Sequence, residues 1–401
     1  MSATEEQLGT VGAALANARR LLRTNPALAQ QQAIEILNVE PRHPGGHLAL
    51  GLAHAGLGQH EAAVDALRRA TDLDPGSAAA WRALADQLTI LEDAAGADAA
   101  YAHSIKASVT DPRLQEAARA LIEGKLAVAE APLRAHLKAQ PTDVAAIRML
   151  AEVGARLGRF EDAEKLLARC LQLAPSFTAA RHNFALVLHR QSKASAALKQ
   201  IDILLDADPD NPSYRFLRAS ALARIGEYAA SIELYESILR QHPNNARGWL
   251  SLGHARKTAG RQQESIEAYA RSIAIAPKFG EGYWSLANMK TYRFDDATVA
   301  AMQAQLKRAD LGEEDRFHLH YALGKAFEDR DDHARAFEHY QLGAKLRRAG
   351  LAYDAEENAQ ATREHAALFT KDFFASRAGR GAGAPDPIFI VGLPRSGSTL
   401  L

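Results

Sequence analysis

Small apolar side chains recur at a fixed spacing along most of the chain and predict pairs of packed helices. The period is 34 residues, and positions 8 and 20, counted with a closing proline as position 32, hold Gly, Ala or Ser in most units. Position 8 is Gly51, Ala85, Ala117, Ala151, Ala185, Ala219, Gly253 and Ala287, and position 20 is Ala63, Ala97, Ala129, Ala163, Ala197, Ser231 and Ser265. Small residues at matched positions let helix axes approach to about 8 Å, the short end of the usual range. Each period is therefore predicted to be one helical hairpin.

Prolines and glycines mark where these helices end. The closing prolines are Pro41, Pro75, Pro141, Pro175, Pro209, Pro243 and Pro277, separated by 34, 66, 34, 34, 34 and 34 residues. Proline stops a helix, and the glycine at position 15, which is Gly58, Gly158, Gly226 or Gly260, supplies a left-handed residue after the first helix. Aromatic residues recur at position 4 (Trp81, Trp249) and position 24 (Tyr101, Tyr235, Tyr269). The one irregular step falls near Val109, where two periods together are two residues short.

A helix-turn-helix unit of 34 residues is similar to the tetratricopeptide repeat. The predicted fold class is all-α, a superhelical solenoid of about ten such units over residues 1–350. Three of these units lack the full pattern or lie outside the series of closing prolines, which we call the proline ladder. They are a weakly matched helix pair at Val11–Leu37, a degenerate unit at about 280–313 and a unit starting at Phe317. An unrelated helical bundle would not hold the same phase from Pro41 to Pro277.

The amino-acid composition limits which kinds of partner and which cellular compartment are expected for this protein. Lys+Arg and Asp+Glu are both 48, so the chain has no net charge that would favour nucleic acid or an anionic membrane. The single cysteine, Cys170, excludes an internal disulfide and Cys₂ or Cys₄ zinc sites, and its packing position predicts a core residue. The start of the chain is acidic and no run of 18 apolar residues occurs. We expect a cytoplasmic protein with no nucleic-acid or membrane partner.

A metal site is not expected in the repeats. His318 and His320 are two residues apart on a predicted helix and therefore do not share a face. The sequence offers them no second pair, so both are interpreted as surface or groove residues.

A basic stripe is expected on the concave face, which the first helices of such an array line. Position 13 is Arg156, Arg190 and Arg224, and nearby positions add Arg148, Arg247 and Lys257. These cations would suit a protein or peptide partner that is acidic. A second explanation stays open, because position 13 lies in the last helical turn, where cations interact favourably with the helix dipole.

The character of the sequence changes after residue 350. Residues 351–386 are expected to form a helix at Asp354–Leu368, an aromatic turn at Phe369–Ala375 and a Gly/Ala/Pro linker. Pro387–Val391 then reads as a buried strand that runs into the glycine loop Gly392–Thr399. A strand, glycine loop and helix in this order cradle phosphate groups. Ser398 stands where a Walker loop has lysine, which argues against ATP or GTP hydrolysis, and the loop's cation is Arg395.

The stretch from Ile388 to Leu400 resembles the 5′-phosphosulfate-binding loop of sulfotransferases. Placed after such repeats, it is similar to the bacterial tetratricopeptide-repeat sulfotransferases, whose catalytic domain resembles tyrosylprotein sulfotransferases. The resemblance implies that residues 387–401 begin an α/β sulfotransferase domain, with 3′-phosphoadenylyl sulfate as donor, no metal, and a hydroxyl acceptor such as protein tyrosine. It implies a catalytic contact from Arg395 to the phosphosulfate. It also implies donor-binding roles for Gly392, Pro394, Arg395, Ser396, Gly397, Ser398 and Thr399.

The same resemblance leaves the activity of these 401 residues open. The family's general base and 3′-phosphate contacts match no residue of this sequence. We therefore expect a truncated sulfotransferase domain, with 387–401 poorly packed and the chain inactive alone. The alternative is a non-enzymatic repeat scaffold for protein interactions.

Overall fold

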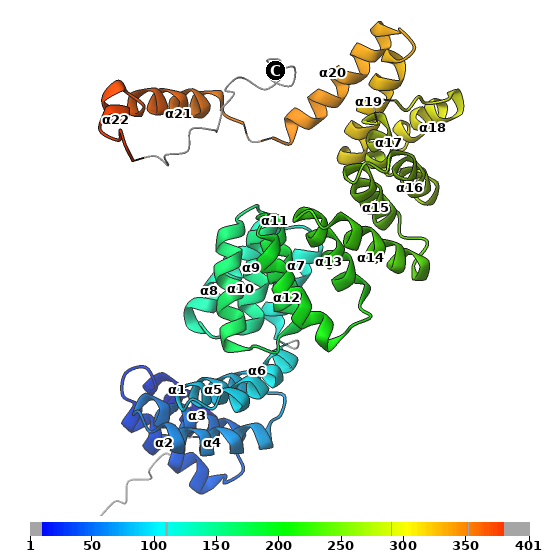
Figure 1. Cartoon of the computed structure of the whole chain (residues 1–401). Helices are drawn as coiled ribbons and strands as arrows, with labels where there is room; N and C mark the ends of the chain where they lie inside the picture. Colours follow the sequence, from blue (N-terminus) through cyan, green and yellow to red (C-terminus); the bar gives the residue numbers. More distant parts are fainter. Residues whose placement is uncertain (1–9, 109–110, 290, 352, 381–401) are drawn as a thin grey trace, which may run out of the picture. The chain divides into compact units, whose positions relative to one another are not determined.

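The computed structural model describes residues 10–108, 111–289, 291–351 and 353–380, and every regular element within these ranges is a helix (Figure 1). In chain order the helices are α1 (Val11–Leu21), α2 (Pro26–Val39), α3 (Pro44–Gly56), α4 (His60–Leu73), α5 (Ala78–Ile90), α6 (Ala94–Ser108), α7 (Pro112–Ile122), α8 (Leu126–Ala139), α9 (Val144–Arg156), α10 (Phe160–Leu173), α11 (Thr178–Arg190), α12 (Ala194–Ala207), α13 (Pro212–Arg224), α14 (Tyr228–Gln241), α15 (Ala246–Thr258), α16 (Gln262–Ile275), α17 (Gly280–Ala287), α18 (Asp296–Leu306), α19 (Glu313–Glu328), α20 (His333–Ala349), α21 (Ala355–Leu368) and α22 (Lys371–Ala375). The predicted all-α fold is confirmed for the described residues. The strand and glycine loop predicted at 387–401 lie outside them.

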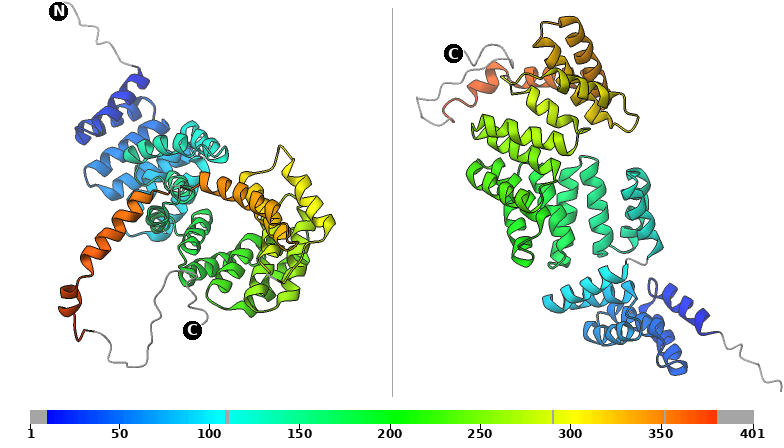
Figure 2. Two further views of the ribbon diagram at one scale, coloured as in Figure 1. Left: turned by 90° about the horizontal axis from the view of Figure 1, so that it is seen from above. Right: turned by 90° about the vertical axis from the view of Figure 1, so that its right-hand side faces the viewer.

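The chain divides into two compact units, Met1–Tyr292 and Arg293–Leu401. In the first unit, α1 to α16 form consecutive hairpins whose two helices are joined by only three or four residues and therefore run antiparallel (Figure 2). The weakly matched pair expected at Val11–Leu37 is α1 and α2. The degenerate unit expected at about 280–313 is divided, because α17 belongs to the first compact unit and α18 to the second.

Polar caps explain why most first helices begin where they do. Asp143 accepts a hydrogen bond from the Ala146 backbone N–H at 3.0 Å, and Ser77, Asn211 and Asn245 cap their helices in the same way. Position 4 adds a second contact at this end of the hairpin. Trp81 and Trp249 donate their indole N–H to the carbonyl oxygens of Pro75 and Pro243, at 3.0 and 2.8 Å. The residue at position 4 thus satisfies a carbonyl that the preceding helix has left without a partner.

The small residues at positions 8 and 20 lie where the two helices of a hairpin cross. Ser231 Oγ donates to Ala219 O at 2.7 Å, and Ser265 Oγ donates to Gly253 O at 2.8 Å. Both serines are fully buried. The close crossing predicted from the sequence is confirmed, and the serine hydroxyls gain a backbone partner there.

The turn inside the hairpin has the same backbone conformation in successive repeats. The glycines predicted at position 15 all have positive φ, for example +76° at Gly158. Three residues with side chains adopt that conformation at the same position, with φ of 60° at Glu92, 61° at Ser192 and 59° at Asp331. The repeat therefore dictates this turn even where the sequence offers no glycine.

The regular stacking is interrupted between α6 and α7, next to the two-residue deficit in the sequence. α4 packs along α5 and α8 along α9, but α6 makes more contact with α9 and with α10 than with α7. Polar contacts hold the α5–α6 hairpin in that place. Asp86 accepts a hydrogen bond from Thr142 Oγ1 at 2.9 Å, and Asp98 accepts one from the Ser176 backbone N–H at 3.1 Å. We call this interruption the stacking break.

In the second unit, α19 and α20 form a hairpin and α18 packs against α19. Gly324 occupies position 8 of this hairpin, and a Cβ atom there would come within 2.6 Å of the Tyr340 ring at position 24. This agrees with the unit that the sequence predicts from Phe317. α21 begins after its N-cap Asp354, as expected, and neither α21 nor α22 contains a buried residue.

Candidate functional site

The first helices of the repeats line one side of the stack in the first compact unit. Between α7 and α15, each first helix contacts the next first helix, as α9 contacts α11 and α13 contacts α15. No second helix from α8 to α16 makes a comparable contact with the next second helix. The stack therefore curves toward α7, α9, α11, α13 and α15, and we call this side the groove.

Two predicted cations lie close enough to one histidine of the groove to affect its pKa. Arg190 and Arg224 are the last residues of α11 and α13, and both are exposed. His189 lies half-buried beside them, with Nε2 3.0 Å from Ser220 Oγ. Burial lowers the pKa of His189, and the charges of Arg224 and Arg190 lower it further. At neutral pH this part of the groove thus presents two guanidinium groups around an uncharged imidazole.

Arg156, the third member of the predicted stripe, is engaged within the protein. Its Nη1 donates to the Leu121 carbonyl oxygen at 2.5 Å, in the last turn of α7. A cation at this place satisfies a carbonyl of the helix end and interacts favourably with its dipole. This contact matches the second explanation for position 13, although the helix that benefits is the preceding first helix.

The other predicted cations lie on two helices. Arg148, on α9, is half-buried and forms an ion pair with Glu152, with 3.1 Å between Nη1 and Oε2. Arg247 and Lys257 are exposed near opposite ends of α15. Their roles in partner binding stay predictions.

Serine, threonine and tyrosine hydroxyls gather in a small pocket near the end of α13. A pocket of about 210 Å³ between α13 and α15 is lined by Ser220, Tyr235 and Ser251, together with His254 and Thr258. Burial raises the pKa of Tyr235, so its hydroxyl stays protonated and can donate. Ser220 and His254 hold the same position of successive repeats, whereas Tyr235, Ser251 and Thr258 hold other positions, and the packing of α13, α14 and α15 brings them together.

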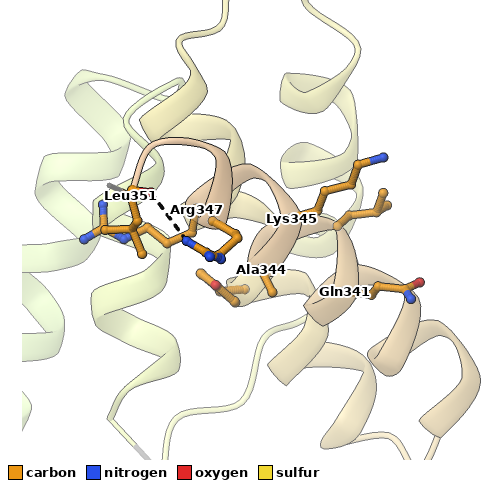
Figure 3. Close-up of a pocket in the computed structure, with 8 residues that line it drawn as sticks. Gln341, Ala344, Lys345, Arg347 and Leu351 are labelled. Atoms are coloured by element: carbon orange, nitrogen blue, oxygen red, sulfur yellow. Dashed lines mark hydrogen bonds between the residues drawn. The ribbon is translucent and has the colours of Figure 1, made fainter. Parts of the chain in front are cut away.

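A pocket of about 780 Å³ lies on α20 in the second unit (Figure 3). Its arginines have partners within the protein. The Arg347 guanidinium lies 5.4 Å from the centre of the Phe317 ring, and Arg348 donates to Leu351 O at 3.4 Å. Lys345 and Gln341 project away from Arg347 and Leu351 (Figure 3).

Outside the groove, the cysteine and two histidine side chains that could act as nucleophiles or metal ligands have partners within the protein. Burial raises the pKa of Cys170 to about 12, and its Sγ donates to Val144 O at 3.4 Å, as expected of a core residue. His320 Nδ1 lies 2.9 Å from His339 Nδ1, a pairing between α19 and α20 that the sequence did not indicate. Among the described residues, no group of three or more His, Cys, Asp or Glu side chains could hold a metal ion. The predicted donor loop, Gly392 to Thr399, lies outside those residues.

Family models match two parts of the first unit. One model, described as tetratricopeptide repeat, matches residues 182–246 and 226–278, and a second with the same description matches 44–86. These segments are tetratricopeptide repeats. The matches and the 34-residue pattern together show that the first unit contains a scaffold of such repeats. None of the described helices is both long and apolar enough to cross a membrane.

Each of the relatives found matches only part of this chain. An uncharacterized protein of Aquifex aeolicus is 29% identical over 112 residues, which are 28% of this chain and 15% of that protein. A tetratricopeptide repeat protein of Parabacteroides merdae is 17% identical, with a TM-score of 0.44 over 62% of this chain and 95% of the other. The human IFIT1 dimer with m7Gppp-AAAA is 18% identical, with a TM-score of 0.46 over 76% and 77% of the two chains.

Proposed function

We propose that the tetratricopeptide repeats of the first unit bind an extended acidic segment of a partner protein in the groove. The observation that carries this proposal is the pair of exposed arginines, Arg190 and Arg224, whose charges both act on a neutral His189. A guanidinium group has five N–H donors, so a helix-end arginine retains donors for a carboxylate of the partner. Because the chain has no net charge, an acidic partner can be attracted only by a local group of cations such as this one.

The neighbouring hydroxyls suit the backbone of an extended peptide. A bound strand brings N–H and C=O groups that lose water and must find partners. Ser220, Ser251 and the protonated Tyr235 offer both donors and acceptors in the pocket near the end of α13. The arginines call for carboxylates in the bound segment, and the hydroxyls call for an accessible peptide backbone. A segment that has both is acidic and extended.

The test measures binding of a fluorescein-labelled peptide of alternating Glu and Ser by fluorescence anisotropy. The double variant Arg190→Glu/Arg224→Glu is expected to bind about tenfold more weakly, since exposed ion pairs contribute about 0.2–1 kcal/mol each. Its matched control is Arg240→Glu/Arg271→Glu, which changes the charge equally with exposed residues of the second helices α14 and α16. Equal weakening in both variants, or no binding to the unaltered protein at millimolar peptide, would refute the proposal.

The sequence of the last residues supports a second proposal. We propose that the chain derives from a tetratricopeptide-repeat sulfotransferase that uses 3′-phosphoadenylyl sulfate, with the repeats holding the partner or the hydroxyl-bearing substrate. The support is the resemblance of Ile388–Leu400 to a phosphosulfate-binding loop. In this proposal Arg395 contacts the phosphosulfate. The backbone of Ser396, Gly397 and Ser398, with the hydroxyls of Ser398 and Thr399, holds the 5′-phosphate, and Gly392 and Pro394 belong to the same donor-binding loop.

Calorimetry with 3′-phosphoadenosine 5′-phosphate tests this second proposal directly. Binding by the unaltered chain should be lost in Arg395→Ala and kept in Arg380→Ala, which removes a linker arginine before the loop. Absence of binding at millimolar nucleotide would leave the repeat scaffold as the function of these residues.

A further inference from the structure

The stacking break opens an apolar pocket in the groove. The pocket has a volume of about 670 Å³ and is bounded by α6, α7, α9 and the start of α11. Its apolar lining includes Ile105, Leu114, Met149 and Phe177, and two cations, Arg119 and Arg148, complete it. We call it the break pocket.

The two-residue deficit explains why this apolar surface is open. Gly124 occupies position 15 of its repeat, so Pro112 is position 3, and α7 begins two residues later in its repeat than α9 and α11 do. With a shortened α7, the hairpin α5–α6 packs toward α9 and α10 instead of lying along α7. Side chains that regular stacking would cover are left uncovered. Ile122, in the pocket lining, is 86% exposed, which is unusual for a large aliphatic residue.

The size and chemistry of the break pocket fit a side chain of a partner. Ligand pockets typically measure about 300–1,000 Å³ and combine an apolar lining with a few polar groups that fix orientation. Here the polar groups are mainly the two arginines. Arg148 is oriented by its ion pair with Glu152, which uses Nη1 and leaves its other N–H groups, while Arg119 is exposed in the last turn of α7. An apolar side chain with a carboxylate beside it satisfies both features.

We infer that the break pocket anchors an aromatic or branched aliphatic side chain of the partner segment, and that a neighbouring carboxylate of this segment pairs with Arg119 or Arg148. The inference rests on the proposed function, since it concerns the same groove. α13 is the first helix of the second hairpin after α9. At the usual spacing of packed helices, the distance between α9 and α13 is therefore about 16–20 Å. An extended chain covers that distance with about five or six residues. The partner would therefore carry its apolar anchor about five or six residues from the carboxylate bound by Arg224, and about three residues from the one bound by Arg190.

Methionine methyl signals make the pocket directly observable. The sequence has four methionines, and Met149 lines the break pocket, whereas Met289 and Met302 are buried elsewhere. In protein labelled with ¹³C at the methionine methyl groups, titration with 3-phenylpropionate should shift the Met149 signal. The signals of Met289 and Met302 should not move, and they report that the protein stays folded. A Met149 signal that does not respond to millimolar 3-phenylpropionate would overturn the inference.

Two variants separate the apolar and ionic parts of the site. Ala179→Leu places a larger side chain at an exposed residue of the lining and should abolish the response, while Ala127→Leu, at an exposed residue of α8, should keep it. Arg148→Gln should weaken binding of 3-phenylpropionate severalfold but leave binding of 3-phenylpropanol unchanged, because only the former has a carboxylate. An equal response in Ala179→Leu and the unaltered protein would refute an apolar anchor site.

The same experiment distinguishes this inference from the proposed function. The Arg190→Glu/Arg224→Glu variant leaves the break pocket intact, so it should bind 3-phenylpropionate normally even if acidic peptides no longer bind. In the acidic peptide, a Phe placed six residues from the Glu stretch, at either end, should increase affinity about tenfold over Ala in at least one of the two peptides. This gain should disappear in Ala179→Leu. If the peptide binds but Phe adds nothing, the groove proposal stands and the anchor inference fails.

Discussion

Gly253 lies directly against the ring of Tyr269, so close that a Cβ atom at Gly253 would be 2.4 Å from Tyr269 Cε1. Gly253→Ala is therefore expected to destabilise the first unit by about 1–3 kcal/mol, the usual cost of overpacking a core. The Tyr269 ring must move to make room for the added methyl group. Urea unfolding followed by tryptophan fluorescence measures the change.

Gly154→Ala is the matched control for this substitution. A Cβ atom at Gly154, inside α9, would meet nothing closer than 3.5 Å. The expected result is a gain of about 0.5–1 kcal/mol, because alanine favours the helix. A loss of stability in Gly154→Ala as large as in Gly253→Ala would show that the close approach to Tyr269 is not the cause.

Ser192→Gly is expected to stabilise the protein by about 1 kcal/mol. Ser192 has a φ of 61°, in the left-handed region that costs a residue with a Cβ about 1–2 kcal/mol. The reverse change, Gly158→Ser, should destabilise by a similar amount, because Gly158 has φ +76° with open space around it. Thermal unfolding of both variants measures the effect, and the same sign in both would contradict this explanation.

Asp143→Ala should lower the free energy of unfolding by about 3 kcal/mol, which is more than the loss of an ordinary helix cap would cause. Asp143 is 6% exposed, caps α9, and accepts a hydrogen bond from His136 Nε2 at 2.8 Å. Arg82 Nη1 lies 3.6 Å from its carboxylate, so the substitution leaves a mostly buried guanidinium without this partner. The control Asn211→Ala removes an uncharged cap and should cost about 1 kcal/mol. Equal losses in urea unfolding would mean that the buried ion pair contributes nothing.

His320 should make stability depend on pH below neutrality. Burial, followed by the charges of His339 and Arg316, lowers the pKa of His320 from 6.5 to about 4. Between these values the unfolded chain binds more protons than the folded chain, so the free energy of unfolding decreases as the pH falls from about 6.5 to about 4. The measurement compares urea unfolding at pH 7.5 and 4.5, monitored by the Met302 methyl signal of the second unit.

In His320→Gln this pH dependence should be smaller than in the unaltered protein. His365→Gln, on the exposed helix α21, serves as the control and should retain the full dependence. Identical pH profiles for all three proteins would contradict the lowered pKa.

Local features of the fold could be predicted from the sequence because each depends on residues close together in the chain. The proline ladder, the small residues at positions 8 and 20, and Gly158 at position 15 specify one hairpin at a time. The positive φ of Glu92 and Asp331 was not predicted, since no glycine marks these turns and the packing of both helices imposes the conformation. Likewise, the sequence placed Arg156 on the groove stripe but could not show that its guanidinium binds Leu121 O, 35 residues earlier.

By itself the sequence determined the repeat, its 34-residue length and the place where the length fails, because helix formation and hairpin crossing follow from local pattern. Only the tertiary structure decided what that failure produces. The break pocket joins residues from Ile105 to Ala179, which meet because α6 packs on α9 and α10 rather than along α7. Which neighbour a helix packs against depends on how the buried surfaces of several hairpins fit together, and a one-dimensional period carries no information on that fit.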